Sequence, residues 1–162
     1  MAKTRWLDEN EQLIWRSFLR TSAKLLNRLD TELMEAAGLE LTDYGILVQL
    51  SEAPDGGLRM SDLAEYSLVS RPRLTVRVQR LVEEGLVERH KCPTDARSTM
   101  VTLTPQGRKR LETAAPVHVA GVRRYFIEPV GPGELCNVAG QLRSVLCALD
   151  DPWVRADADA RD

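Results

Sequence analysis

Four arginines lie within ten residues of the chain, at positions 71, 73, 77 and 80, and no acidic residue lies among them. The planar guanidinium of arginine binds phosphate, and it donates two parallel hydrogen bonds to the edge of a guanine base. The segment 70–84, SRPRLTVRVQRLVEE, therefore carries the side-chain chemistry of a nucleic-acid contact. A solvated cationic face on an ordinary helix has the same composition, so the neighbouring elements must distinguish the two.

The spacing of apolar residues in this segment predicts an amphipathic helix. Residues at i, i+4, i+7 and i+8 form one buried stripe, made of Leu74, Val78, Leu81 and Val82. Ser70 is placed to cap the helix, Pro72 fits its first turn, and Gly85 fits its C-terminal stop. Arg73 and Val76 then lie on the side opposite the stripe.

Four elements are expected before this helix. Helical spacing predicts a long helix over about 10–37, ended by Gly38, and a second over 42–53 that begins at Thr42 as its cap. The first is ~40 Å long, more than a small core needs, so we expect part of it to pack on another subunit. After the turn signal at 54–57, a minimal strand at 58–60 leads to a short helix capped by Ser61.

The period changes to alternation after Gly85. Residues 86–91 and 99–103 alternate between apolar and polar, which predicts a two-stranded hairpin around the polar loop 92–98. Two short helices followed by a hairpin make a winged helix-turn-helix. Two further helices are expected, one over 106–127 with a kink at Pro116 and one over 134–149 that buries its apolar stripe. The predicted fold class is thus mainly α, an α+β winged helix with helical additions at both ends.

Charge is distributed unevenly along the chain. The net charge of the 162 residues is −2, but 69–97 hold seven Lys or Arg against four Asp or Glu, which leaves −5 for the remainder. A basic patch on an acidic body is typical of a specific nucleic-acid binder. The chain contains no Walker loop, dinucleotide fingerprint or nucleophile elbow, and its two histidines and three scattered cysteines predict no metal site. We therefore predict no enzymatic activity, no cofactor and, without an apolar N-terminal leader or a long apolar run, a cytoplasmic protein.

Several motifs resemble the MarR family of winged-helix transcription regulators. They are Ser70, Thr75, Leu81, Gly85-Leu86-Val87, Arg89, Asp95-x-Arg97 and Leu103-Thr104-x-x-Gly107, and the likeness spans about 39–111. The chain departs from the usual pattern in the wing, where Ala96 replaces a frequent arginine and Ser98 a frequent glycine. In the recognition helix Val76 replaces a frequent arginine and Arg77 a frequent apolar residue.

The resemblance implies a homodimer that binds a pseudo-palindromic DNA operator, with 1–38 and 105–150 as its helical dimerisation region and 39–104 as the winged helix-turn-helix domain. It implies that helix 71–85 enters the major groove and that Arg97, oriented by Asp95, enters the minor groove. Guanidinium chemistry supports base or phosphate contacts, and the two hydroxyl side chains suit phosphates. The predicted DNA-binding residues are Ser70, Arg71, Arg73, Thr75, Val76, Arg77, Arg80, Asp95 and Arg97. For Arg80 a salt bridge is the alternative.

The means of regulation stays open at this stage. Family members often hold an anionic aromatic effector between their first, second and fifth helices, which here would be lined by Trp15, Arg16, Leu19, Arg20, Tyr44 and His118. Core packing is the alternative for Trp15 and Tyr44. These residues favour a repressor released by a small molecule. The alternatives are a redox sensor at Cys92, whose basic neighbours favour a thiolate, and a winged helix that binds proteins without specific DNA binding. We expect Cys136 and Cys147 to pack in a core, and the acidic tail 151–162 to be disordered.

Overall fold

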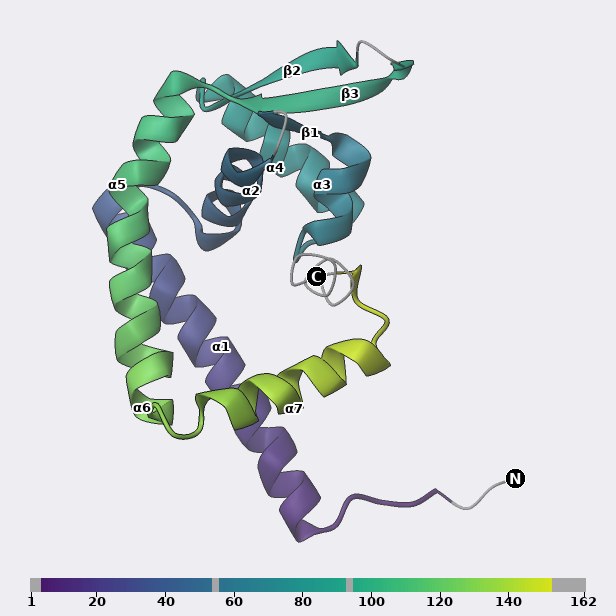
Figure 1. The fold of residues 1–162 in the computed structure, drawn as a ribbon, viewed down its shortest axis with the longest axis vertical. Helices are drawn as coiled ribbons and strands as arrows, with labels where there is room; N and C mark the ends of the chain where they lie inside the picture. Colours follow the sequence, from purple (N-terminus) through teal and green to yellow (C-terminus); the bar gives the residue numbers. More distant parts are fainter. Residues whose placement is uncertain (1–3, 54–55, 93–94, 153–162) are drawn as a thin grey trace.

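A computed structural model describes residues 4–53, 56–92 and 95–152, with the side chains of 95–97 left out. In chain order the elements are α1 (Glu9–Ala37), α2 (Leu41–Glu52), β1 (Gly57–Arg59), α3 (Met60–Tyr66), α4 (Arg71–Glu83), β2 (Val87–Cys92), β3 (Asp95–Leu103), α5 (Pro105–Val122), the π-helix η1 (Arg123–Ile127), α6 (Glu128–Val130) and α7 (Leu135–Ala148) (Figure 1). The acidic tail predicted to be disordered lies, from residue 153 on, outside the described residues.

The three strands form one antiparallel sheet in the order β1-β3-β2. Val101 of β3 pairs with Leu58 of β1 on one side and with Arg89 of β2 on the other. With α3 and α4 before it, this sheet confirms the predicted winged helix in a mainly α chain. Strand β3 begins at Asp95, four residues earlier than predicted, because pairing with β2 continues to Cys92.

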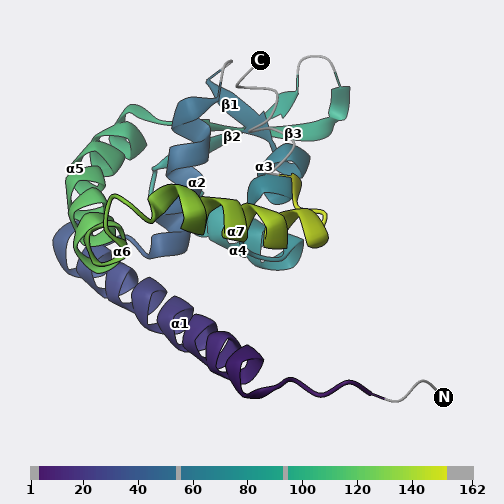
Figure 2. The ribbon, with the colours of Figure 1, turned by 60° about the horizontal axis from the view of Figure 1, so that its bottom comes forward.

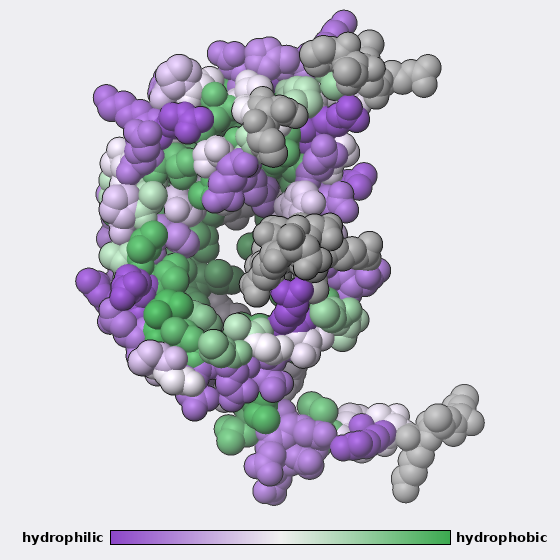
Figure 3. Space-filling view, in the orientation of Figure 1, coloured by the Kyte–Doolittle hydropathy of each residue, from purple (hydrophilic) through white to green (hydrophobic). Residues whose placement is uncertain are grey.

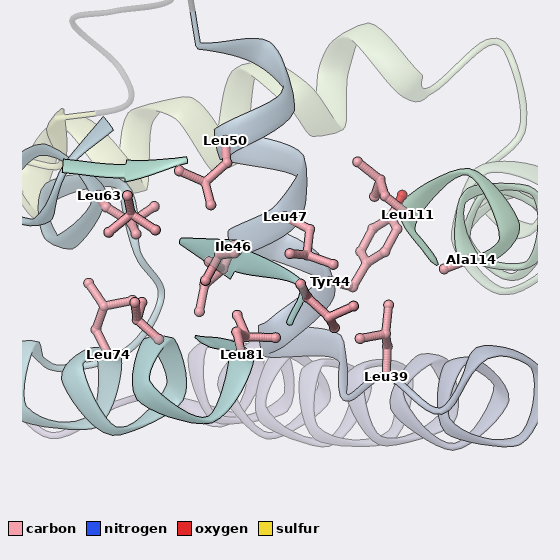
Figure 4. Packing of buried hydrophobic residues seen from close by; sticks show 14 of the residues in the cluster. Leu39, Tyr44, Ile46, Leu47, Leu50, Leu63, Leu74, Leu81, Leu111 and Ala114 are labelled. Atoms are coloured by element: carbon pink, nitrogen blue, oxygen red, sulfur yellow. The ribbon is translucent and has the colours of Figure 1, made fainter. Parts of the chain in front are cut away.

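The hydrophobic core lies within the winged helix and reaches α5 and the end of α1. Figure 4 shows leucines of α2, α3 and α4 pointing toward one another, with Leu111 and Ala114 approaching from α5. Leu74, Val78 and Leu81 of α4 are each 0% exposed. The predicted apolar stripe is therefore the face through which the arginine-rich helix packs against the hydrophobic core.

Two helix caps differ from the prediction. Helix α2 begins at Leu41 with Glu40 at the N-cap position, and Asp30 of α1 accepts a hydrogen bond from the Leu41 N–H (2.7 Å). Helix α3 begins at Met60, and the Ser61 hydroxyl donates to Asp62 instead of capping. The predicted caps at Thr42 and Ser61 are wrong because both helices begin earlier: Asp30 bonds the first N–H of α2, and Ser61 lies inside α3.

The joint between the hairpin and α5 gives structural roles to three of the motif residues named above, Gly85, Thr104 and Gly107. The Thr104 hydroxyl oxygen accepts from the Gly107 N–H (2.9 Å) and donates to the Gly85 carbonyl (2.7 Å). A Cβ at Gly107 would lie 2.0 Å from the Leu86 carbonyl oxygen, so only glycine allows this approach. Gly85 itself has φ +72°, the left-handed conformation that ends α4.

Helix α5 continues through Pro116 to Val122 and then changes to the wider turn of η1. Within η1, Tyr125 donates to Glu32 of α1 (2.6 Å), and Arg28 donates to the same carboxylate (3.0 Å). Hydrogen bonding to Tyr125 and to Arg28 holds the pKa of Glu32 below its usual value despite partial desolvation. The π-helix thus fixes α5 against the middle of α1.

Large apolar surfaces remain outside the core. The N-terminal half of α1 extends away from the rest of the chain in Figures 1 and 2, and Ile14, Trp15 and Phe18 on it are exposed by 70%, 51% and 49%. Helix α7 contains no buried residue, so the stripe that was predicted to be buried is not covered within the described part of this chain. Figure 3 shows hydrophobic side chains gathered around a hollow on the side where α5 leads to α7.

Cys136 and Cys147 are exposed on α7, and the prediction that they pack in a core is wrong. They share a face, as their spacing indicates. That face, however, lies away from the apolar stripe of Val138, Leu142, Val145 and Leu149.

Candidate nucleic-acid interface

The exposed side of α4 is formed by Arg71, Arg73, Thr75 and Val76. Neither Arg71 nor Arg73 has a side-chain hydrogen bond or an ion pair with another described residue, and Val76 is 69% exposed. Ser70 stands at the N-cap position but its side chain makes no capping bond, while the Thr75 hydroxyl donates to the Arg71 carbonyl (3.1 Å). The first two turns of α4 therefore present cationic, apolar and hydroxyl groups together to solvent.

Arg77 and Arg80 are instead bound to carboxylates of the α1–α2 junction. Arg77 lies 2.5 Å from Glu40 and 3.4 Å from Asp43. Arg80 lies 2.6 Å from Glu40 and 3.7 Å from Asp43, and it also pairs with Glu84 (2.9 Å). The side chains of Arg77 and Arg80 are only 29% and 40% exposed. These two arginines join α4 to α2. For Arg80 the structure shows the salt bridge that sequence analysis gave as the alternative to DNA contact.

The two carboxylates of this network respond differently to their surroundings. Hydrogen bonding to Arg80, aided by Arg77, lowers the pKa of Glu40. Burial raises the pKa of Asp43, which is 1% exposed, against the opposing attraction of Arg77 and Arg80. The Asp43 Oδ1 atom is buried without a hydrogen-bond partner among the described residues. The network therefore holds one satisfied and one poorly solvated carboxylate beneath α4.

Arg89 of β2 ties the wing to the same helix. Its Nη1 donates to the Gln79 side-chain oxygen (3.1 Å) and its Nη2 to the Thr75 carbonyl (3.2 Å). The backbone of Asp95 and Arg97 lies at the start of β3, but their side chains are outside the described residues. The predicted minor-groove contact of Arg97 and the orienting role of Asp95 stay predictions.

Sequence analysis missed Glu40, Asp43 and the bridging role of Arg89. Asp43 had a usable signal, since it stands in the apolar stretch LTDYGILVQL of α2. A carboxylate on a buried helix needs a cationic partner, and the arginine-rich helix is the nearest source in the sequence. Which arginines would turn inward depends on how α2 crosses α4, which the sequence does not show.

The residues proposed to line an effector site are not all brought together. The rings of Tyr44 and His118 lie 4.6 Å apart between α2 and α5, and burial lowers the pKa of His118. Trp15, Arg16, Leu19 and Arg20 are exposed on the extended half of α1, where Trp15 stacks on Phe18. Trp15 is fifteen residues from Asp30, the α1 residue bonded to α2, or about 22 Å along the helix. Within one chain these six residues form two separate groups, and Trp15 does not fill the core.

Cys92 is the last residue of β2 and is 6% exposed, so its side chain is largely shielded from solvent. Among the described residues no three His, Cys, Asp or Glu side chains are grouped to hold a metal ion. No helix in the described ranges has both the length and the apolar character needed to cross a membrane.

Known proteins resemble this chain over most of its length. The family model described as MarR family matches residues 37–98. The transcriptional activatory protein BadR of Rhodopseudomonas palustris is 32% identical over 93% of this chain and 89% of its own. The HTH-type transcriptional repressor YetL of Bacillus subtilis is 29% identical over 62% of this chain and 60% of its own.

A solved structure shares the arrangement of the elements. Sco3205, a MarR family transcriptional regulator from Streptomyces coelicolor crystallised in complex with DNA, superposes with a TM-score of 0.84. It is 38% identical, and the match covers 88% of this chain and 89% of Sco3205. These relatives are transcription regulators and not enzymes.

Proposed function

Because the chain belongs to the MarR family of transcription regulators, we propose that it regulates transcription by binding a double-stranded DNA operator through α4. The observation that carries this proposal is the exposed first half of α4. Arg73 and Val76 project from the side of the helix opposite its buried stripe, and Arg71 is exposed at the first position of the helix. Arginines near the start of a recognition helix read base edges in the major groove. The relative Sco3205, which was crystallised with DNA, supports the same use of the fold.

The second part of the proposal is a homodimer. Residues 1–38 and 105–150 would form the dimerisation region, and 39–104 the DNA-binding domain. The exposed apolar residues of α1 and the unburied helix α7 support this division, because a large apolar surface without a covering element is typical of an interface. A two-fold dimer would present both α4 helices to a pseudo-palindromic operator.

Selection of DNA from a random pool by the purified protein tests the proposed function. We expect a pseudo-palindromic consensus, and we expect affinity for it to fall steeply as salt rises, because phosphate contacts release counterions. Recovery of no consensus, together with weak binding that does not depend on salt, would favour the alternative of a protein-interaction module.

The direction of regulation is proposed to be repression. The relatives include one named an activatory protein and one named a repressor, so a reporter placed behind the selected operator is the deciding measurement. Expression that falls when the protein is supplied supports repression, and expression that rises shows activation.

A further inference from the structure

An apolar side chain occupies the middle of the surface that α4 turns to solvent. Val76 is 69% exposed, and the helical repeat places it about 160° around α4 from Leu74 and Val78 of the buried stripe. A single exposed valine is ordinary on a protein surface. This valine, however, stands among arginines on the face that the proposed function assigns to DNA, so its neighbours decide what it can contact.

The polar side chains one turn after Val76 are already bonded within the chain. Gln79 uses both ends of its amide, since its Oε1 accepts from Arg89 (3.1 Å) and its Nε2 donates to Glu83 (2.9 Å). Arg80 is held by the carboxylates described above. A base edge that approaches the middle of α4 therefore meets the methyl groups of the valine.

A hollow of about 470 Å³ adjoins Val76 on the side toward the start of α2. Val69 and Pro72 line it together with Val76, and the lining also includes Thr42 of α2 and Arg73. A methyl group placed against Val76 from outside would thus lie beside further apolar side chains. Burial of apolar surface in such a place is favourable.

The major groove presents one methyl group among its base edges. Thymine carries it at C5, whereas guanine, adenine and cytosine are recognised there by their hydrogen-bonding groups. A valine that covers a hydrogen-bonding group leaves that group without a partner, which costs free energy. A valine that covers the thymine methyl group buries apolar surface on both sides. Val76 therefore favours thymine.

Arg73 indicates where in the operator this thymine lies. It stands three residues before Val76, or about 4.5 Å along the axis of α4. Successive bases of one DNA strand are about 3.4 Å apart along the duplex. The two side chains therefore reach neighbouring base pairs, and the guanidinium of Arg73 suits a guanine.

From these observations we propose that Val76 is a specificity-determining residue, which selects a thymine in each half of the operator by contact with its 5-methyl group. The inference rests on the proposed function and adds the chemical group that is recognised. Because 5-methylcytosine carries its methyl group at the same ring position, it satisfies the same contact. Methylation of a cytosine at this position therefore strengthens binding.

Replacement of thymine by uracil tests the contact in the unaltered protein. It removes the methyl group and keeps every hydrogen-bonding group of the base pair. In the operator selected from the random pool, each consensus thymine is replaced in turn, in both half-sites, and affinity is measured by titration. We expect one sensitive thymine per half-site, within two base pairs of the pair whose preference relaxes in Arg73→Ala. Its replacement should weaken binding about fourfold per half-site, or about fifteenfold for both.

Two variants assign the effect to Val76. Val76→Ala removes both γ-methyl groups, so uracil in both half-sites should change its affinity by less than about twofold. Leu68→Ala is the matched control, because Leu68 is an apolar side chain that is 96% exposed on the connection before α4. It should keep the full response to uracil. Both variants should unfold at the temperature of the parent, since neither side chain belongs to the core.

Cytosine and 5-methylcytosine at the sensitive position give the reverse test, in which a methyl group is added. The parent should bind the methylated operator about fourfold more tightly per half-site, and Val76→Ala should bind both operators alike. A consensus with no uracil-sensitive thymine, a response to uracil that persists in Val76→Ala, or no gain from 5-methylcytosine would overturn this inference and leave the proposed function standing. Recovery of no consensus would refute the proposed function, and the methyl contact with it.

Discussion

Arg73 and Arg77 stand one turn apart on α4, but among the described residues only Arg77 is held by carboxylates. Arg73→Ala should therefore weaken binding of the selected operator by ~1–3 kcal/mol and relax preference at one base pair. Its thermal stability should stay that of the parent. Arg73→Lys is the matched control, since it keeps the charge but loses bidentate bonding. Equal losses on all sequences would show that Arg73 contacts only phosphate.

Arg77→Ala should act on stability as well as on binding. It leaves Glu40 and the buried Asp43 with Arg80 alone, so we expect the free energy of unfolding to fall by ~1–3 kcal/mol. Denaturant unfolding of the Arg73→Ala and Arg77→Ala variants side by side measures this difference. Equal free energies of unfolding for the two variants would mean that the ion pairs of Arg77 do not stabilise the packing of α4 on α2.

The pH dependence of stability should separate the two acids of the network. Burial raises the folded-state pKa of Asp43 above its ordinary value of 3.8, so the folded state binds the proton more tightly, and stability falls as pH rises between these two values. The parent should thus gain stability relative to Asp43→Asn as pH falls through that window. Glu40 has a lowered pKa, so the parent should lose stability relative to Glu40→Gln as pH falls below 4.5. Urea unfolding at a series of pH values gives both differences, and the same sign for both would contradict this account.

Cys92 is better placed for packing than for sensing, because its side chain is 6% exposed. A redox-sensing thiol has to be reached by its oxidant. Cys92→Ser should therefore leave operator affinity, and any effect of hydroperoxide on it, nearly unchanged in a titration with and without peroxide. Loss of a peroxide effect that the parent shows would restore the redox alternative.

At the scale of elements, the joint between the hairpin and α5 is set by one glycine. Gly107→Ala would drive a Cβ into the Leu86 carbonyl and separate α5 from the sheet, so we expect a loss of about 1–3 kcal/mol in the free energy of unfolding. Gly140→Ala is the control, because a Cβ there meets nothing and the helix α7 gains propensity. Chemical denaturation of both variants measures these changes in the free energy of unfolding. A Gly107→Ala protein as stable as the parent would show that α5 can shift away from the Leu86 carbonyl without loss of stability.

Elements whose signals are local were predictable from the sequence. The α4 stripe, the Gly38 and Gly85 stops and the Thr104 cap depend on residues within a turn or two, and the structure confirms them. The start of α2 was not predictable in detail, because its first N–H is bonded by Asp30 of another helix. The ion pairs of Arg77 were also missed, because Glu40 and Asp43 lie more than thirty residues before it in the sequence. Periodicity shows that α7 has an apolar face, but not which chain covers it.

At the scale of the whole molecule, one face of α7 is left uncovered by the part of the chain that the structure describes. Leu142, Val145 and Leu149 are 41%, 55% and 71% exposed and lie on one stripe with Val138. The exposed half of α1 offers a second apolar surface. The two surfaces together exceed what a stable monomer leaves uncovered, so a second copy of the chain is the simplest cover. We therefore expect sedimentation to give twice the mass of one chain at micromolar concentration.

This dimer also sets how the two recognition helices meet DNA. Val145→Glu puts a charge into the stripe and should give monomers, whereas Ser144→Glu adds the same charge on the opposite side of α7 and should leave the dimer intact. The operator of a two-fold dimer has half-sites about 10 bp apart, because both α4 helices must enter the major groove on one side of the duplex. A monomer contacts one half-site, so Val145→Glu should bind a full operator no better than an isolated half-site, while Ser144→Glu should show the parent's preference for the full operator. Sedimentation and binding titrations on the two DNA lengths measure both effects. A monomeric Val145→Glu protein that still preferred the full operator would break the link between α7 and two-site recognition.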